Sequence, residues 1–207
     1  MLNSHAPSLS QQLNEQLREA AVQRGILPTD APSLTPEVAF ALVRDMPYAR
    51  ASTHEPAGII GEWRGTCSTK HELLAALLAE HGLESAIVAC TQEIKLPDDA
   101  DPALRALSGG QSVVDIHNYL VVDTPQGQMK VDATWPMRAA EVGLPVNAAW
   151  QWGEDMTLAC IPLESWTVPD GETVSGFKDR LLAERYSPEE LQRRDHFIRK
   201  VGELFLR

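Results

Sequence analysis

The sequence predicts an α+β domain, because helix-forming and strand-forming patterns occupy separate parts of the chain. Three helices are expected first, over residues 8–24, 35–46 and 67–80, and each is followed closely by glycine or proline. A run rich in β-branched residues, 85–94, and two further runs around a proline–glycine turn, 112–123 and 128–135, predict an antiparallel sheet. Helical patterns return over 170–207, so we expect helices at both ends of the chain and the sheet between them.

The length and composition fit one globular domain with a sizeable core. The chain has 207 residues, of which 43% are hydrophobic and 23% charged, and no clear boundary divides it. Its net charge of −11 argues against a nucleic-acid partner, because an acidic surface repels phosphate groups. No apolar run approaches the roughly 20 residues that span a bilayer, so no membrane partner is expected.

Cysteine and histidine usage bears on location and cofactors. Cys67, Cys90 and Cys160 are too few for a disulfide framework, and the N-terminus lacks the basic and apolar regions of a leader. We therefore expect a reducing, cytoplasmic location, with Cys90 and Cys160 in structural roles. The histidines lack the spacing of metal ligands, so neither a metal nor another cofactor is expected. Oligomeric state is not indicated.

A cysteine stands at the predicted start of the most strongly helical segment. Gly65 and Thr66 precede Cys67, and helix-forming residues continue to Glu80 before Gly82 ends the run. At a helix N-terminus, the macrodipole and the free N–H groups favour a thiolate over a thiol. Cys67 is therefore a candidate nucleophile, although a buried cysteine that only packs would fit the same stretch.

The predicted hairpin brings a histidine and a carboxylate together. With a loop of two or four residues centred on Pro125 and Gln126, the numbers of paired residues sum to 251. His117 then lies opposite Thr134 and shares a face with Asp132, roughly 7–8 Å away as a diagonal neighbour. A loop of three or five residues would place the two on opposite faces unless a bulge restored the phase.

A cysteine, a histidine and an aspartate in this order suit acyl chemistry. A thiolate attacks a carbonyl carbon, an imidazole exchanges protons with the thiol and the leaving group, and a carboxylate orients the imidazole. The sequence predicts Cys67, His117 and Asp132 in these three roles.

Three stretches of the chain resemble the transglutaminase-like superfamily. The run GTCSTKHELLAALLAEHGL from Gly65 resembles its cysteine helix, DIHNYLVVD from Asp115 its histidine strand, and VDATWP from Val131 its aspartate strand. The resemblance covers about residues 60–136. It implies a papain-like core in which the cysteine helix packs on an antiparallel sheet, flanked by helices in 1–46 and 170–207. It also implies hydrolysis of a peptide or small amide, or acyl transfer to an amine.

The oxyanion donors depart from the papain pattern. That group usually has a glutamine shortly before the nucleophile, and none lies between Arg24 and Cys67. The backbone N–H of Cys67 would supply one donor. Trp63 is a candidate for the second, although a role in the core or at its rim would also fit.

Two further residues are candidates for contact with substrate. Asp115 would orient His117 or bind substrate, unless it is an exposed carboxylate at the start of a strand. Trp135 begins a series of tryptophans that extends to Trp166 and points to an apolar, partly covered groove.

Two other functions are open at this stage. The run from Arg64 to Cys67 also resembles arylamine N-acetyltransferases, which use the same three residue types on acetyl-CoA, although the chain is short for that family. Alternatively, the fold is a binding module without activity, because a fold does not fix a function.

The remaining segments carry weaker signals. Residues 47–61 are expected to be a loop, and 97–110 a surface loop or a short helix. Covering loops are expected over 136–169, with one strand at 156–161. Ser187 begins a capping box with proline at the first helical position, which predicts a C-terminal helix.

Overall fold

The computed structural model describes residues 13–94, 102–109 and 111–206. Seven α-helices and four strands follow one another in these parts of the chain, with a 3-10 helix over Met137–Val142. Their bounds are α1 (Leu13–Gln23), α2 (Pro36–Asp45), α3 (Pro56–Glu62), α4 (Cys67–Glu80), β1 (Ser85–Ile94), α5 (Pro102–Ser108), β2 (Val113–Thr124), β3 (Gly127–Val131), β4 (Ser165–Thr167), α6 (Val174–Arg185) and α7 (Pro188–Phe205).

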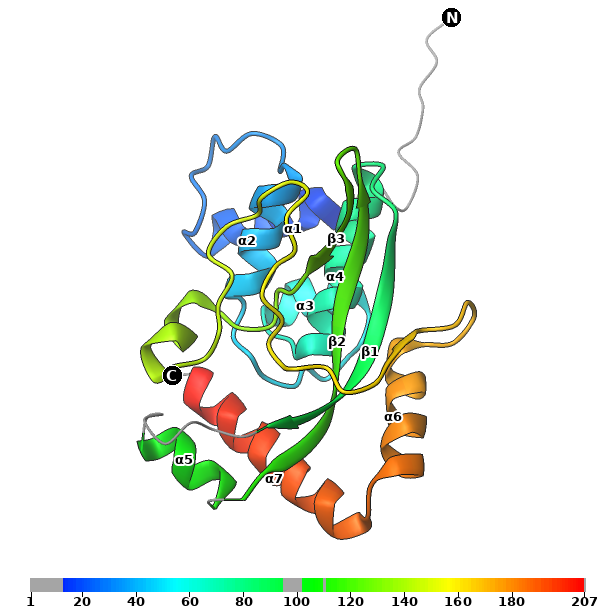
Figure 1. The fold of residues 1–207 in the computed structure, drawn as a ribbon. Coiled ribbons are helices and arrows are strands. Elements are labelled where there is room, and N and C mark those ends of the chain that lie inside the picture. The colour runs from blue at the N-terminus through cyan, green and yellow to red at the C-terminus, as the bar shows by residue number, and fades with distance from the viewer. Residues whose placement is uncertain (1–12, 95–101, 110, 207) are drawn as a thin grey trace, which may run out of the picture.

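The strands form one antiparallel sheet in the order β3-β2-β1-β4, so the α+β class is confirmed (Figure 1). The hairpin register is confirmed as well, since Leu120 pairs with Val131 and Asp123 with Gln128. However, β3 ends at Val131 and does not continue to residue 135 as the pattern predicts. Asp132 therefore lies just beyond the ladder, where its carboxylate is free to turn toward the interior.

Two predicted segments differ from the structure. Residues 47–61 are not a continuous loop, because α3 begins at Pro56; Ile59 and Ile60 bury its inner side against the main core. Residues 156–161 form no strand, and β4 follows later. Backbone N–H groups of this segment donate to side chains instead of to a neighbouring strand. Thr157 N–H donates to Asn147 Oδ1, and Ala159 N–H donates to Asp132 Oδ2. Of the first predicted helix, residues 8–12 lie outside the described residues.

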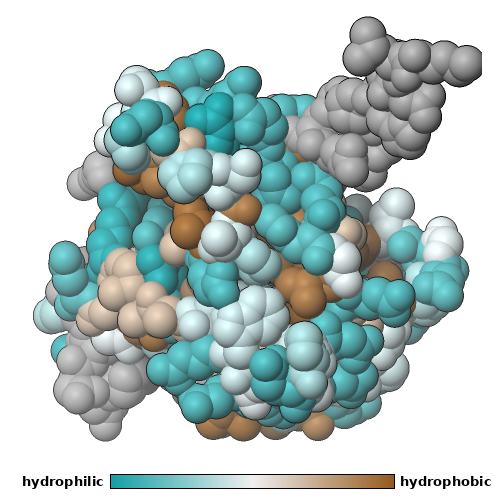
Figure 2. All heavy atoms as spheres, turned by 90° about the horizontal axis from the view of Figure 1, so that it is seen from above, coloured by the Kyte–Doolittle hydropathy of each residue, from teal (hydrophilic) through white to brown (hydrophobic). Residues whose placement is uncertain are grey.

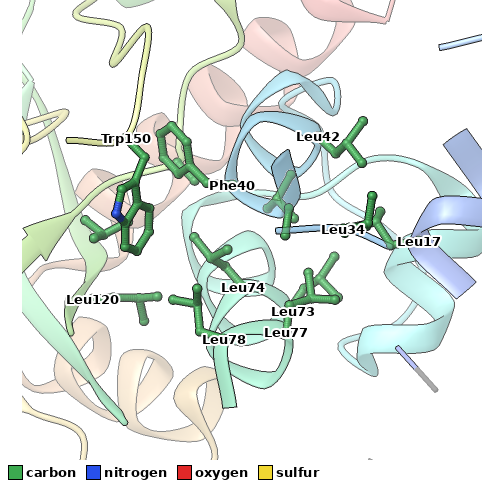
Figure 3. Close-up of a cluster of buried hydrophobic side chains, with 14 of the residues drawn as sticks. Leu17, Leu34, Phe40, Leu42, Leu73, Leu74, Leu77, Leu78, Leu120 and Trp150 are labelled. Atoms are coloured by element: carbon green, nitrogen blue, oxygen red, sulfur yellow. The ribbon is translucent and has the colours of Figure 1, made fainter. Parts of the chain in front are cut away.

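Helix α4 is the centre of the main hydrophobic core. Its leucines lie between β2 on one side and helices α1 and α2 on the other (Figure 3). Four of them are fully buried: Leu73, Leu74, Leu77 and Leu78. Glu80, in the last turn of α4, accepts the first two N–H groups of α1, so the C-terminal end of α4 is also fixed. The helix thus holds Cys67 at a rigid end of the core.

The two C-terminal helices cover the end of the sheet where β1 finishes and β2 begins (Figure 1). On α6, Phe177 and Leu181 pack with Ala89 and Ile116 of the sheet. On α7, a second apolar stripe joins a cluster that also contains Tyr48 and Val113. These helices lie far from α4 in the sequence and close to its N-terminus in space.

The face of the molecule shown in Figure 2 is predominantly hydrophilic, and its apolar residues form small, separate patches. Within the described residues, no helix combines the length and the apolar character needed to cross a bilayer.

Candidate active site

The N-terminus of α4 presents Cys67 as its first residue. Thr66 is the N-cap, and its backbone N–H donates to Thr69 Oγ1 at 3.0 Å. Gly65 approaches this turn closely: a β-carbon there would lie 2.8 Å from Thr69 Oγ1 and 3.0 Å from Lys70 Cγ. The glycine therefore permits the turn that sets the position of the cysteine.

We predict that Gly65→Ala destabilises the protein by about 1–3 kcal/mol, because the new methyl group overpacks this turn. Gly61→Ala is the matched control, since a β-carbon there has no atom within 4 Å and lies in helix α3. That change should be neutral or stabilising by roughly 0.5 kcal/mol. Urea unfolding of both variants measures the difference, and equal effects would refute the assigned role of Gly65.

The structure brings His117 and Asp132 together. Nε2 of His117 donates to Asp132 Oδ2 over 2.8 Å, and both side chains are buried. His117 also interacts with the thiol group of Cys67, and each side chain favours the charged form of the other. Because Nε2 is taken by the carboxylate, Nδ1 is the nitrogen that remains for the sulfur. The three residues predicted from the sequence thus form one interacting series, Cys67–His117–Asp132.

Backbone donors fix the Asp132 carboxylate. Oδ1 accepts the N–H of Thr134 at 3.0 Å, while Oδ2 accepts the N–H of Ala159 at 2.7 Å in addition to His117. Burial raises the pKa of Asp132, but the charge and hydrogen bond of His117 outweigh burial and hold the pKa well below its ordinary value. The group is therefore a carboxylate at neutral pH.

A second histidine links α4 to the segment that carries Asp132. His71 Nε2 accepts the backbone N–H of Ala133 at 2.9 Å, so Nδ1 carries the proton and donates to the carbonyl of Cys67 at 2.7 Å. Burial lowers the pKa of His71 to about 4, which keeps the ring neutral. His71 therefore acts as a neutral brace between the two elements.

A buried lysine provides a second brace. Lys70 Nζ donates to the carbonyls of Arg44 (2.8 Å) and Thr134 (3.0 Å), which joins α4 to α2 and to the segment after β3. Burial lowers the pKa of Lys70 to about 7. In addition, Ser68 Oγ donates to Asn118 Oδ1 at 2.8 Å, so the first turn of α4 is also tied to β2.

Electrostatics at Cys67 favour the thiolate. Burial alone would raise its pKa, but the positive charge of Lys178 and the hydrogen bond and charge of His117 lower the pKa to about 6. Burial likewise opposes the charged form of His117, yet Asp132 and Cys67 raise its pKa well above the ordinary value. A thiolate–imidazolium pair is therefore the favoured state at neutral pH.

Asp115 lies beside this pair and is not an exposed carboxylate. It is 1% exposed and accepts Arg194 Nε at 2.5 Å, while Lys178 Nζ lies 3.5 Å away. Burial raises its pKa, but the charges of Lys178 and Arg194 outweigh burial and lower it. Both cations come from the C-terminal helices: Lys178 from α6 and Arg194 from α7.

Two cavities flank the site. The larger one, of about 450 Å³, lies between the C-terminal helices and residues 48–54 and is lined in part by Thr66, Ser68 and Lys178. The smaller one, of about 50 Å³, is lined by His117, Asp115, Gln92, Thr134 and several mainly apolar side chains. Cys67 itself is only 1% exposed.

The two tryptophans named from the sequence lie in different places. Trp135 packs against Tyr48, with ring centroids 4.5 Å apart, and lines the small cavity beside His117. Trp63 packs against the main core beneath Arg24, whose guanidinium lies 4.7 Å from the ring centroid. None of the described contacts joins Trp63 to the Cys67–His117–Asp132 series.

The other two cysteines lie on the sheet. Cys90 is buried on β1 as the register partner of His117, and its sulfur lies 3.6 Å from that of Cys160. All three cysteines are free thiols.

Reasoning from the sequence did not include Lys178 and Arg194 among the site residues. The sequence signal that could have identified them is a positively charged residue within the apolar stripe of a predicted helix. Lys178 lies four residues from both Val174 and Leu182, and Arg194 lies four residues before Ile198. A charged residue at such a position is buried, and it therefore needs a buried partner.

The fold and the site together define the class: an α+β protein with a buried cysteine, histidine and aspartate joined at a helix N-terminus. Comparisons of the chain with protein-family models, with curated proteins and with solved structures gave no match. Within the described residues, no cluster of three or more histidine, cysteine or acidic residues could hold a metal ion.

Proposed function

We propose that the protein is an enzyme that uses Cys67 for acyl chemistry on amides, in the manner of the transglutaminase-like superfamily and its papain-like core. The observation that carries the proposal is the placement of His117 between the Cys67 thiol and Asp132, with Nε2 held at 2.8 Å from the carboxylate. This arrangement provides a nucleophile, a proton carrier and an orienting group.

The first half-reaction forms a thioester. The Cys67 thiolate attacks the carbonyl carbon, the C–S bond forms, and the carbonyl electrons move to oxygen. When this oxyanion collapses, the C–N bond breaks and His117 gives its Nδ1 proton to the departing amine. The N–H groups at the start of α4 are suited to stabilise the oxyanion, because they have no partner within the helix.

The second half-reaction restores the enzyme. Neutral His117 removes a proton from water or from an acceptor amine, which then attacks the thioester carbonyl. The C–S bond breaks, and the thiolate and imidazolium pair forms again. Water gives hydrolysis and an amine gives acyl transfer.

The 450 Å³ cavity is the proposed substrate site. Thr66 and Ser68, which flank Cys67, belong to its lining, so a group bound there would lie next to the nucleophile. Its volume is in the range of small-molecule sites and suits a small amide or one side chain of a peptide.

We predict that Cys67→Ala abolishes activity while the fold is retained, because the sulfur is the attacking atom. The test uses p-nitrophenyl acetate: the wild type should release p-nitrophenol in a burst and gain an acetyl group at Cys67, seen by peptide mass. The burst should disappear in Cys67→Ala. Cys160→Ala is the control, because that thiol is more exposed than the thiol of Cys67 but lies outside the series.

Two results would reject the proposal. One is a folded Cys67→Ala variant with full activity. The other is a wild-type Cys67 with ordinary thiol reactivity and no acetylation. The second result would favour a binding module, a function with which the burial of Cys67 is also compatible.

A further inference from the structure

We propose that Lys178 is a further catalytic residue, whose ammonium group is the counter-ion of the Cys67 thiolate and is held in place by Asp115. This inference rests on the proposed function and makes α6 and α7 part of the catalytic unit. It deepens the proposal by adding a fourth group, from outside the core segment 60–136, to the Cys67–His117–Asp132 series.

Distances place the ammonium group at the reacting atom. Lys178 Nζ lies 3.6 Å from Cys67 Sγ and 3.5 Å from Asp115 Oδ1. The side chain is 9% exposed, so bulk water and salt screen the two interactions only slightly. Within the described contacts, no other lysine or arginine nitrogen is hydrogen-bonded to this sulfur.

Charge balance supports the same assignment. Lys178 and Arg194 are two buried cations that share one buried carboxylate, Asp115. His117 and Asp132 already form a balanced pair. Arg194 also pairs with Asp195 at 2.9 Å, but that carboxylate is exposed, so Asp115 is the one buried carboxylate that these two cations share. A thiolate at Cys67 supplies a second buried negative charge directly beside Lys178.

The other ionisable groups around the sulfur do not take this role. His117, Asp115 and Arg194 have the partners described above, and Lys70 is bound to two backbone carbonyls. Three further groups interact electrostatically with Cys67 and are uncharged in their usual forms: Tyr48, Cys90 and Cys160.

The location of Lys178 also defines the approach of substrate. Lys178 lines the 450 Å³ cavity, whereas Cys67 is not among the described residues of its lining. A carbonyl group that approaches from the cavity therefore meets the ammonium group before the sulfur. When charge moves from sulfur to the carbonyl oxygen, the ammonium group is already adjacent to both.

The test is the pH dependence of Cys67 alkylation by iodoacetamide, followed by peptide mass on the reduced full-length protein. The variants are Lys178→Met, which removes the charge at similar size, and Lys178→Arg, which keeps the charge. Lys200→Met is the control, because Lys200 is a lysine near the surface of α7 whose ion pair within the described residues is with Glu203. Lys178→Gln replaces the methionine variant if that variant lacks native near-UV circular dichroism.

For the wild type, the expected midpoint is about pH 6, and for Lys200→Met it is the same. Loss of the charge should raise the midpoint by about one pH unit or more, toward the ~8.5 of an ordinary thiol. Lys178→Arg should remain closer to the wild type than the neutral variants.

An unchanged pH midpoint of Cys67 alkylation in the folded neutral variants would overturn the role of Lys178. A higher limiting alkylation rate at high pH, without a shift of the midpoint, would overturn it as well, because it would show that Lys178 only covers the sulfur. Both results leave the proposed function intact. A wild-type midpoint near 8.5, in contrast, would reject the proposed function itself.

Discussion

Asp132→Asn is expected to lower turnover of p-nitrophenyl acetate by about 10²- to 10⁴-fold, with little loss of expression or fold. The reason is that the Asp132 carboxylate is the acceptor in each of its three side-chain hydrogen bonds. Thr134 N–H reaches Oδ1, while Ala159 N–H and His117 Nε2 reach Oδ2. An amide has only one oxygen, so its NH₂ group must face at least one of these donors.

Either orientation of the amide impairs His117. If the NH₂ group faces the ring, Nε2 becomes an acceptor and the proton moves to Nδ1, which then cannot accept the proton of Cys67. If the oxygen faces the ring, the carboxylate charge is still lost, and that charge helps to raise the pKa of His117. The imidazolium is therefore less stable in both cases.

The control is Asp155→Asn, a carboxylate that binds Lys130 at the surface and should leave turnover unchanged. The alkylation midpoint of Cys67 should also rise in Asp132→Asn, because the imidazolium partner is weakened. Equal turnover in the two variants, with both folded, would show that Asp132 does not orient His117.

Local patterns were sufficient to predict much of the fold. The start of α4 at Cys67 and the register of the β2–β3 hairpin follow from residue types at short spacing, and the structure has both. From that register, the proximity of His117 and Asp132 followed as well. These features depend on residues no more than fifteen positions apart, within the reach of turn and strand geometry.

The missed features depend on distant parts of the chain. Helix α3 has two glycines in seven residues, and its burial against α1 and α4 overrides this weak propensity. Residues 156–161 have a strand-like pattern, but Asn147 and Asp132 bind backbone donors that a ladder would need. Lys178 meets Cys67 across 111 positions, for which no local pattern exists.

Asp115→Asn should destabilise the protein by about 3–5 kcal/mol, because it removes the buried carboxylate that Lys178 and Arg194 share and leaves Arg194 only the exposed Asp195 as an acidic partner. The change should also loosen α6 and α7 from β2, since Asp115 is the residue that joins both helices to the strand by charge. Urea unfolding at pH 7 measures the loss, and proteolysis within residues 174–205 would show whether the C-terminal helices open first.

Glu203→Gln is the matched control for this change. Glu203 is a surface carboxylate on α7 that also pairs with two cations, Arg199 and Lys200, and its loss should cost at most about 1 kcal/mol. The pKa of Asp115 is lowered in the folded state, so its contribution is present above the ordinary carboxyl range and is lost as the pH falls through the lowered value. The difference in stability between wild type and Asp115→Asn should therefore persist at pH 5–7 and shrink in stronger acid. Equal losses for the two variants would mean that the buried charges at the end of the sheet do not hold the C-terminal helices on the candidate site.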